Sequence, residues 1–270
     1  MTRIPFVAGK KEYAEWYDRC GYNPIWTEEE CDLLDEIFSR YGSNVHDVLD
    51  LTCGTGRHCI GLAKRDYKMT GVDNNPYVLE MAKSKSTDLG IEYICQDVLD
   101  IDFEESFESA IIMFNTLMIF SDNDELIGLF ERVRRALRGE GLFVIQIPNF
   151  WSMFKEGTFV DRDWERTVPV SEDEKWIQKH KTTLYSYDNL YKSFREVIVL
   201  RGGERCSSFQ EKAICRIISP NELDLLCRLT NFTIIKLLGR LDIEADLGEK
   251  NHSQIIAILK KVSRDEKLRA

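Results

Sequence analysis

The stretch VLDLTCGTGRH, residues 48–58, places a short apolar segment directly before two glycines that are separated by one residue. The segment has the composition of a buried strand, yet it carries Asp50 near its end, where a buried carboxylate costs free energy unless a partner compensates it. Gly54 and Gly56 also cost backbone entropy, and glycine is needed where a ligand approaches the main chain closely or where the chain turns left-handed. These features indicate a ligand site at the turn.

Strand and helix patterns alternate on both sides of this turn. Helical patterns at residues 10–20 and from Thr27 to Gly42 precede it. Further strands and helices are predicted at Val45–Leu51, Arg57–Arg65, Lys68–Val72, Pro76–Ser84, Ile91–Cys95, Glu108–Phe114, Leu126–Leu137 and Gly141–Ile147. The run ESAIIMF is almost entirely apolar, as expected of a parallel strand that is buried on both faces. This order predicts an α/β fold with a doubly wound sheet.

The pattern changes after Pro148. Residues 174–218 alternate apolar, polar and aromatic positions, and the pair Gly202-Gly203 separates two strand-like runs as a hairpin turn does. We therefore predict a small antiparallel β insertion over residues 151–218 rather than a separate domain.

The last part of the chain returns to the first type of pattern. Ser219 and Pro220 have the signature of a capped helix start. The closing elements are a helix to about Leu229 and strands at Phe232–Leu238 and Gln254–Lys260. Residues 219–262 thus complete the α/β domain that residues 1–150 begin.

Composition excludes several classes of protein. The chain has 270 residues, of which 43% are hydrophobic and 30% charged, as in soluble globular proteins. A formal net charge of −10 argues against a nucleic-acid partner or an anionic membrane surface. The N-terminal sequence MTRIPFVAGKKEYAEW lacks the apolar run of a signal peptide, so we expect a cytoplasmic protein. The eight cysteines form no C-x-x-C pair and no zinc-like spacing, so we expect reduced thiols and no metal.

A second acid points to the class of ligand. Asp73 ends the strand after the turn, 19 residues beyond Gly54, where an acid can accept hydrogen bonds from both ribose hydroxyls of an adenosine-type ligand. The dinucleotide fingerprint G-x-G-x-x-G/A needs a small residue where this chain has Cys59. Asp50 would repel a pyrophosphate but suits a cationic α-amino group. S-adenosylmethionine is therefore favoured over NAD, and an NAD-dependent oxidoreductase is the weaker alternative.

Four stretches carry a family resemblance. VLDLTCGTGRH, GVDNNPYVLEMAK, YICQDVLDIDF and LRGEGLFVIQIPN resemble, in order and spacing, the successive motifs of class I S-adenosylmethionine-dependent methyltransferases. The resemblance covers about residues 45–150. It implies a seven-stranded Rossmann-like sheet, whose last strand is inserted antiparallel, and S-adenosylmethionine as the cofactor. The insertion resembles that of the subgroup acting on small molecules, including glycine and amino-sugar N-methyltransferases.

The same resemblance implies a cofactor site. Its positions in this chain are Tyr17, Asp50, Cys53, Gly54, Gly56, Asp73, Asn74, Asp97, Val98 and Asn115. The turn residues would border the methionine moiety. Asp97 would accept from the adenine amino group, with Asn74 and Val98 beside the ring. Asn115 would face the methionine end, and Tyr17 would belong to an N-terminal helix that closes over the cofactor.

The acceptor is less well specified. In this family the cofactor carries the reactive methyl group, and orientation of the acceptor can replace a general base. No base is identifiable, so the catalytic residues are left unassigned, and a cofactor-binding protein without transferase activity is the alternative. The chain has NTLM, residues 115–118, where adenine- and glutamine-modifying enzymes have [DN]-P-P-[YF]. We expect a small-molecule acceptor and no nucleic acid or membrane partner; the acceptor's identity, the methylated atom and the oligomeric state are left open.

We expect the acceptor pocket above the carboxyl ends of the strands. Aromatic rings there would either surround a cationic amine or form the insertion's own small core. The candidate residues are Phe150, Trp151, Trp176, Tyr185 and Arg195. We expect His58, which follows the turn, to contact solvent or backbone rather than to act in catalysis.

Overall fold

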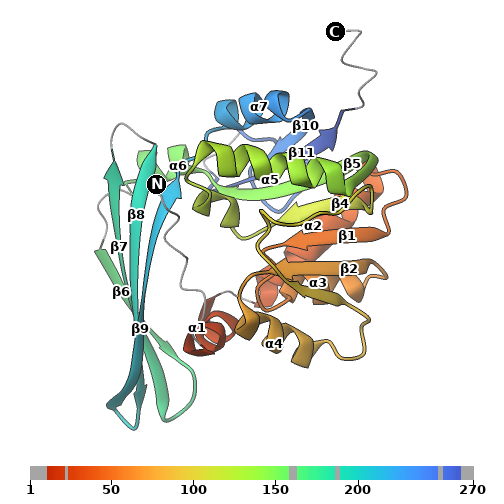
Figure 1. The fold of residues 1–270 in the computed structure, drawn as a ribbon. Coiled ribbons are helices and arrows are strands. Elements are labelled where there is room, and N and C mark those ends of the chain that lie inside the picture. The colour runs from red at the N-terminus through yellow and green to blue at the C-terminus, as the bar shows by residue number, and fades with distance from the viewer. Residues whose placement is uncertain (1–10, 22–23, 158–162, 186–188, 249–251, 263–270) are drawn as a thin grey trace.

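The computed structural model describes residues 11–21, 24–157, 163–185, 189–248 and 252–262. Residues 1–10, which belong to the stretch tested for a signal peptide, lie outside the described residues. Within the described ranges, no helix is both long and apolar enough to cross a membrane. The chain forms a large sheet with helices on both faces and a second sheet that stands across the ends of its strands (Figure 1).

The large sheet has seven strands, as predicted. They are β1 (Asp47–Leu51), β2 (Lys68–Asp73), β3 (Glu92–Cys95), β4 (Phe107–Ile112), β5 (Leu137–Pro148), β10 (Phe232–Leu238) and β11 (Gln254–Lys261). Their order is β10-β11-β5-β4-β1-β2-β3, and β11 pairs antiparallel with both β5 and β10. The order reverses beside β1, and ligands of such sheets bind at this switch point, at the carboxyl ends of the strands.

Helices cover both faces of this sheet. They are α2 (Pro24–Tyr41), α3 (Arg57–Ala63), α4 (Pro76–Lys85), α5 (Asn123–Ala136) and α7 (Pro220–Leu229). The apolar sides of α2, α3 and α4 contribute to the core on one face, and those of α5 and α7 to the core on the other. The shorter helical segments are α1 (Lys11–Trp16), the π-helical turn η1 (Tyr17–Gly21), the 3-10 turn η2 (Thr116–Ile119) and α6 (Phe150–Lys155).

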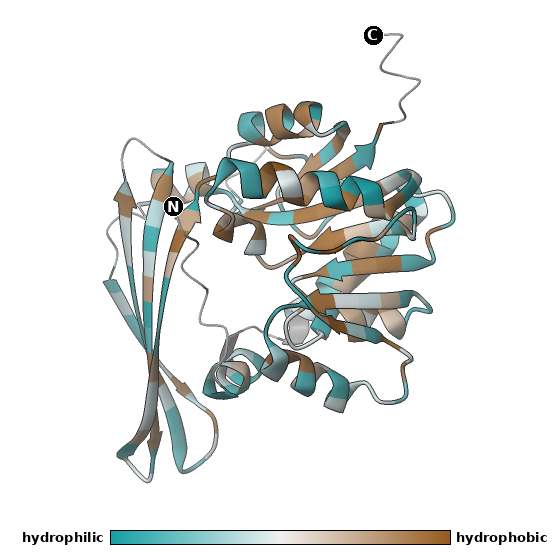
Figure 2. Ribbon diagram, viewed as in Figure 1, coloured by the Kyte–Doolittle hydropathy of each residue, from teal (hydrophilic) through white to brown (hydrophobic). Residues whose placement is uncertain are grey.

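The two cores take alternate residues from each central strand. In β1, Leu49 and Leu51 belong to the core under α5 and α7, while Val48 belongs to the core under α2 and α3. Figure 2 shows the central strands of the large sheet as predominantly hydrophobic, as expected of strands covered on both faces. The hydrophobic pattern of a strand's sequence therefore does not tell which helix each of its side chains packs against.

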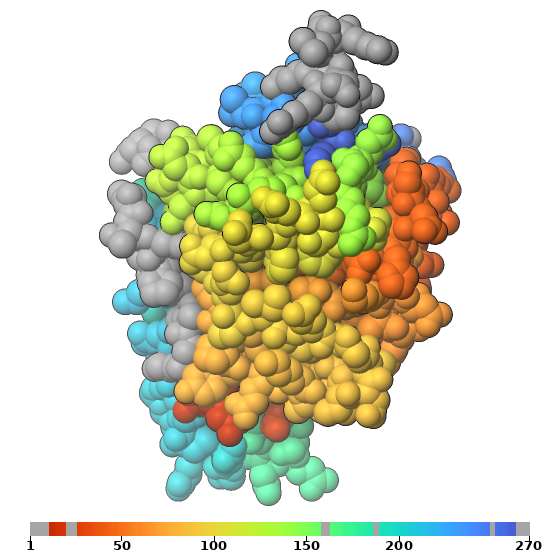
Figure 3. Space-filling model, turned by 45° about the vertical axis from the view of Figure 1, so that its right-hand side comes forward, coloured from red at the N-terminus to blue at the C-terminus, as the bar shows by residue number. Residues whose placement is uncertain are grey.

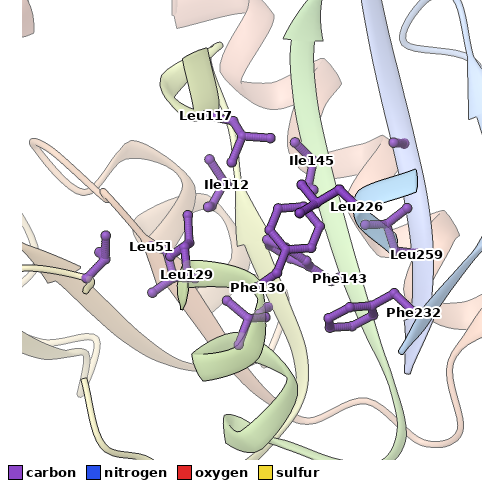
Figure 4. Close-up of a cluster of buried hydrophobic side chains, with 14 of the residues drawn as sticks. Leu51, Ile112, Leu117, Leu129, Phe130, Phe143, Ile145, Leu226, Phe232 and Leu259 are labelled. Atoms are coloured by element: carbon purple, nitrogen blue, oxygen red, sulfur yellow. The ribbon is translucent and has the colours of Figure 1, made fainter. Parts of the chain in front are cut away.

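Three aromatic rings form the centre of the core under α5. Phe130 of α5 and Phe143 of β5 lie 5.2 Å apart between ring centroids, and Phe232 of β10 lies 6.0 Å and 5.8 Å from them. These rings face one another in Figure 4. Each such pair contributes about 0.5–1.5 kcal/mol beyond the area that it buries, so this contact ties the reversed end of the sheet to its parallel part.

The second sheet, here called the roof, is antiparallel as predicted for the insertion. It comprises β6 (Asp163–Pro169), β7 (Glu174–Tyr185), β8 (Leu190–Arg201) and β9 (Glu204–Arg216), in that order. Gly202 and Gly203 form the β8–β9 turn with φ values of 58° and 85°, which favour glycine. The alternation of colours along the roof strands in Figure 2 agrees with one buried and one solvent-facing side.

Some boundaries differ from the predictions for local reasons. Helix α2 begins at Pro24 rather than at Thr27, whose hydroxyl accepts a hydrogen bond from Arg57 Nη1 at 3.1 Å instead of capping the helix. Helix α5 begins three residues early, at Asn123, because Asp122 accepts from the N–H groups of the first turn. Strand β6, turn η2 and helix α6 were not predicted.

Candidate functional site

A cavity of about 500 Å³ lies between the carboxyl ends of the parallel strands, the N-terminal helix α1 and the roof. Its volume is typical of small-molecule sites. Seven of the ten predicted cofactor residues line it: Tyr17, Gly54, Asp73, Asn74, Asp97, Val98 and Asn115. These residues come from five separate segments, so the fold gathers them at one place.

The carboxylate of Asp73 is oriented by the backbone on both sides. Gly54 N donates to its Oδ2 at 2.9 Å, and Asn75 N donates to its Oδ1 at 2.9 Å. Asn75 in turn caps α4 by accepting from Tyr77 N at 3.0 Å. Burial raises the pKa of Asp73, against these two hydrogen bonds. Each oxygen keeps a further lone pair, so the site presents two fixed acceptors, as a ribose diol requires.

Tyr17 covers the glycine turn from above. A Cβ added to Gly54, whose φ is +56°, would lie 3.3 Å from a ring carbon of Tyr17, so a larger residue would disturb this contact. The Tyr17 ring also stacks on Tyr13 at 6.0 Å and meets the edge of Phe114 at 6.1 Å. Figure 3 shows atoms of the N-terminal helix between α4 and the roof. Helix α1 and turn η1 therefore close one side of the cavity.

Asp97 and Asn74 lie together at the β3 end of the cavity. Leu99 N donates to Asp97 Oδ1 at 3.0 Å, and Asn74 Nδ2 donates to Oδ2 at 3.4 Å. Val98 beside them is buried and apolar. This end thus offers a carboxylate, an amide and an apolar surface, a combination that suits a planar heterocycle with an exocyclic amino group.

Asn115 lies at the opposite side, after β4. Both Phe114 and Asn115 have left-handed backbones, with φ of 57° and 64°, a conformation that costs about 1–3 kcal/mol for a residue other than glycine and is less costly for Asn. Phe114 N donates to Gln146 Oε1 at 2.7 Å, which holds this corner. Asn115 Oδ1 is buried and has no hydrogen-bond partner among the described residues. A ligand with a donor group here would satisfy it.

Asp50, Cys53 and Gly56 lie outside the cavity lining. Asp50 is 1% exposed and points toward α3, where Cys59 Sγ lies 3.3 Å from its Oδ2. A Cβ on Gly56 would lie 2.5 Å from the Tyr93 hydroxyl, so this glycine permits packing between α3 and β3. Direct contact of these three residues with a cofactor stays a prediction.

The buried Asp50 makes the stability of the fold depend on pH. Burial raises its pKa from 3.8 to about 7, so its ionised form is disfavoured in the folded state. The pKa shift corresponds to a cost of about 4 kcal/mol for holding the ionised Asp50 in the folded protein. The variant Asp50→Asn removes this cost but buries a neutral amide, which costs about 2 kcal/mol.

We expect Asp50→Asn to raise the free energy of unfolding by about 2 kcal/mol at pH 8; this gain should shrink as the pH falls below 7, reach zero near about pH 5, and become a loss of about 2 kcal/mol near pH 4. The sign follows because the pKa of Asp50 is higher in the folded than in the unfolded state. The native protein therefore loses stability as the pH rises toward and through the folded-state pKa, and the variant does not. Urea denaturation across this range measures it. Asp47→Asn, at the solvent end of the same strand, is the control: the pKa of Asp47 is lowered despite burial, by Lys68 and Arg138, so its loss should destabilise at pH 8. A pH-independent difference for Asp50→Asn would contradict the prediction.

A buried polar network beneath the cavity was not predicted. Glu30 of α2 binds Arg57 and His58 through Oε2, the latter at 2.9 Å, and accepts from Gln146 Nε2 through Oε1 at 3.1 Å. All four side chains are at most 6% exposed. The expectation that His58 meets solvent or backbone is therefore wrong. Through Gln146 the network reaches Phe114, beside Asn115.

Burial, hydrogen bonds and neighbouring charges together set the protonation states in this network. Burial, with the charge of Arg57, lowers the pKa of His58 to about 4, so the imidazole is neutral near pH 7. Burial opposes ionisation of Glu30, but its hydrogen bonds and neighbouring charges outweigh that cost and lower its pKa to about 2. Arg57 is thus the cation that compensates Glu30.

The predicted acceptor residues are mostly elsewhere. Phe150 is buried against Tyr191, Trp151 is 62% exposed, and Trp176 donates to Glu174 at 2.6 Å and packs in the apolar cluster between the roof and α1. These three and Tyr185 do not line the cavity, whereas Arg195 does. Among the residues that the structure describes, no three His, Cys, Asp or Glu side chains gather as a metal site.

The cavity fits S-adenosylmethionine on three observations. Asp73 presents two oriented acceptors, Gly54 leaves the space that a Cβ would take beneath Tyr17, and Asn115 Oδ1 is a buried acceptor with no partner among the described residues. The adenosyl group would be held by Asp73, Asn74, Asp97 and Val98, and the amino acid part would lie toward Asn115.

Comparisons with known proteins agree with this geometry. Residues 48–141 match the family described as a methyltransferase domain. A Geobacillus sp. (strain WCH70) protein named as a candidate methyltransferase is 26% identical over 161 residues, which are 57% of this chain and 65% of that relative. The chain thus spans just under two thirds of that relative's length.

Solved structures share the fold. An S-adenosylmethionine-dependent methyltransferase from Clostridium acetobutylicum superposes with a TM-score of 0.76 at 18% identity, over 93% of this chain and 98% of that one. CalS10, an amino pentose methyltransferase from Micromonospora echinaspora solved with S-adenosylmethionine bound, gives 0.70 at 16% identity, over 93% and 97%. These likenesses extend over the roof as well as the large sheet. Residues 48–141 thus match a methyltransferase domain, and the chain is similar in fold to S-adenosylmethionine-dependent methyltransferases.

Proposed function

We propose that this protein transfers a methyl group from S-adenosylmethionine to a small-molecule acceptor, which binds between the carboxyl ends of the large sheet's strands and the roof. The observation that carries the proposal is the convergence of seven cofactor residues, predicted from separate motifs, on one cavity that continues to the roof. The acidic net charge and the enclosed cavity favour a small acceptor over a nucleic acid, and a cytoplasmic location agrees with both.

When bound, S-adenosylmethionine supplies an electrophilic methyl group on a sulfonium. The chain's own residues hold and orient: Asp73 fixes the ribose, and Tyr17 with helix α1 excludes water from above. The roof holds the acceptor so that its nucleophilic atom approaches in line. Orientation of this kind lowers barriers by about 7–11 kcal/mol, so no general base is required. CalS10, which shares this fold, is an amino pentose methyltransferase. This relative supports a small polar acceptor.

Calorimetry with cofactors tests the first half of the proposal. S-adenosylhomocysteine is expected to bind with micromolar affinity, while NADH does not bind, because Cys59 stands where the dinucleotide fingerprint needs a small residue. Incubation with methyl-labelled S-adenosylmethionine and pools of amines, sugars and carboxylates tests the second half. NADH binding without adenosyl binding would replace the proposal by an oxidoreductase. Tight adenosyl binding without turnover across all pools would favour a cofactor-binding protein that lacks transferase activity.

A further inference from the structure

The inner face of the roof carries a row of polar side chains. His180 on β7, Arg195 on β8 and Glu211 on β9 are direct cross-strand neighbours, and we call them the polar row. On one side of the row the roof packs on α1 through an apolar cluster, and on the other it packs on α6 through a second one. Polar groups between two apolar contacts cost stability, so a packing role does not explain them.

Each member of the polar row leaves one hydrogen-bonding atom unused. Arg195 Nη1 donates to Glu211 Oε2 at 2.8 Å. Arg195 Nε, Glu211 Oε1 and His180 Nδ1 are buried and have no hydrogen-bond partner among the described residues. Buried groups left without a hydrogen bond are costly and rare in folded proteins. Of the three side chains, Arg195 lines the cavity, so a bound molecule there can complete its hydrogen bonding.

Two arginines contribute to this wall of the cavity. Arg195 and Arg166 both line the cavity, and Arg166 Nε donates to Gln178 Oε1 at 3.0 Å. Burial, with Arg195 nearby, lowers the pKa of His180 to about 4, so its imidazole is neutral near pH 7. Burial raises the pKa of Glu211, against the attraction of Arg195. Arg195 therefore faces the cavity beside a carboxylate whose ionised form burial disfavours.

The aromatic surface nearby is already occupied. The guanidinium carbon of Arg195 lies 4.8 Å from the ring centroid of Trp16, which also lines the cavity. A cation in the ligand would have to compete with Arg195 for this ring. An anion, in contrast, would gain charge-assisted hydrogen bonds from the same arginine.

We infer that Arg195, the member of the polar row that lines the cavity, recognises the acceptor, and that the acceptor carries a carboxylate or phosphate group bound by Arg195. This inference rests on the proposed function and names the substrate class of the same site. It replaces the expectation of an aromatic box around a cationic amine by recognition of an anionic, hydrogen-bonding metabolite.

Calorimetry on the protein saturated with S-adenosylhomocysteine tests it. The probes are acetate, inorganic phosphate, neutral acetamide and methylammonium. Acetate or phosphate is expected to bind saturably, and the preferred one tells carboxylate from phosphate, whereas acetamide and methylammonium do not bind. In Arg195→Met the anion affinity should fall at least roughly tenfold, the loss of one charge-assisted hydrogen bond. Arg205→Met, on the exposed end of β9, is the matched control and should not change it.

Arg195→Met leaves the buried Glu211 without its ion-pair partner and can therefore unfold the protein. The double variant Arg195→Met/Glu211→Gln also removes that carboxylate and keeps the test valid if the single variant unfolds. Arg195→Lys should retain most of the anion affinity. Unchanged anion affinity in the double variant, a preference for methylammonium, or no anion binding to the cofactor-loaded protein would each overturn the inference. Absence of S-adenosylhomocysteine binding, measured beforehand, would instead overturn the proposed function.

Discussion

Glu30→Ala is expected to lower the free energy of unfolding by about 3–5 kcal/mol, the cost of leaving a buried charge without its partner. Arg57 would remain enclosed, at 6% exposure, with its compensating carboxylate removed. Gln146 Nε2 would lose its bond to Glu30 Oε1, although it also donates to Gln254 Oε1 at 2.8 Å. Chemical denaturation at pH 7 measures the loss.

The same residue sets a pH dependence with a defined sign. The pKa of Glu30 is lowered from 4.5 to about 2 in the folded protein, so its contribution is complete above pH 4.5 and is lost as pH falls toward 2. The pKa of His58 is lowered from 6.5 to about 4, so stability also falls as pH drops below 6.5 and the unfolded chain takes up a proton. In Glu30→Ala the part of this acid sensitivity between pH 4.5 and 2 should be missing.

Two further variants separate the ion pair from helix α2 itself. Glu36→Ala lies on the same helix, where an exposed pair with Arg40 at 3.2 Å should be worth at most about 0.5 kcal/mol. Glu30→Leu combined with Arg57→Met removes both charges and should recover part of the loss, because an apolar pair of similar volume replaces a buried ion pair well. Equal losses for Glu30→Ala and Glu36→Ala would refute the burial argument.

The sequence was sufficient for the order of the elements and the general position of the site. Hydrophobic periodicity and turn residues are local signals, so the apolar run at 108–114 and the glycine turn could be placed without knowing what they contact. Asp73 was found in the same way, because the carboxyl end of a strand beside a glycine turn has a fixed place in such a sheet. The resemblance then supplied the reversed last strand, which periodicity alone does not predict.

Contacts between distant segments could not be predicted. Glu30 and Gln146 are 116 residues apart and meet only because α2 crosses the face of β5. Asp50 was expected beside the cofactor, but strand alternation turns it toward α3, and alternation alone does not tell which face of the sheet carries which helix. In the roof, alternation predicted strands correctly, and the candidate Arg195 does line the cavity, but alternation did not show that Trp176 packs in the apolar cluster between the roof and α1.

Asp73→Ala is expected to weaken S-adenosylhomocysteine binding by about 3 kcal/mol, roughly a hundredfold, since two ribose hydroxyls would each lose a charge-assisted hydrogen bond. The structure adds a second reason. Gly54 N and Asn75 N both donate to this carboxylate, so its removal also releases the glycine turn that lies beneath Tyr17. Calorimetric titration with S-adenosylhomocysteine measures the change, after a thermal scan has established that the variant is folded.

Adenosine separates the ribose contact from a general loosening of the site. Because Asp73 would act on the ribose, the affinity for adenosine should fall by about the same factor as that for S-adenosylhomocysteine, whereas Asn115→Ala should weaken only the ligand that carries the amino acid part. Asp88→Ala, an exposed acid after α4, is the matched control and should leave both affinities unchanged. A folded Asp73→Ala protein that binds both ligands like the native chain would show that the ribose lies elsewhere. In that case the two backbone donors, rather than a ligand, would account for the position of this carboxylate.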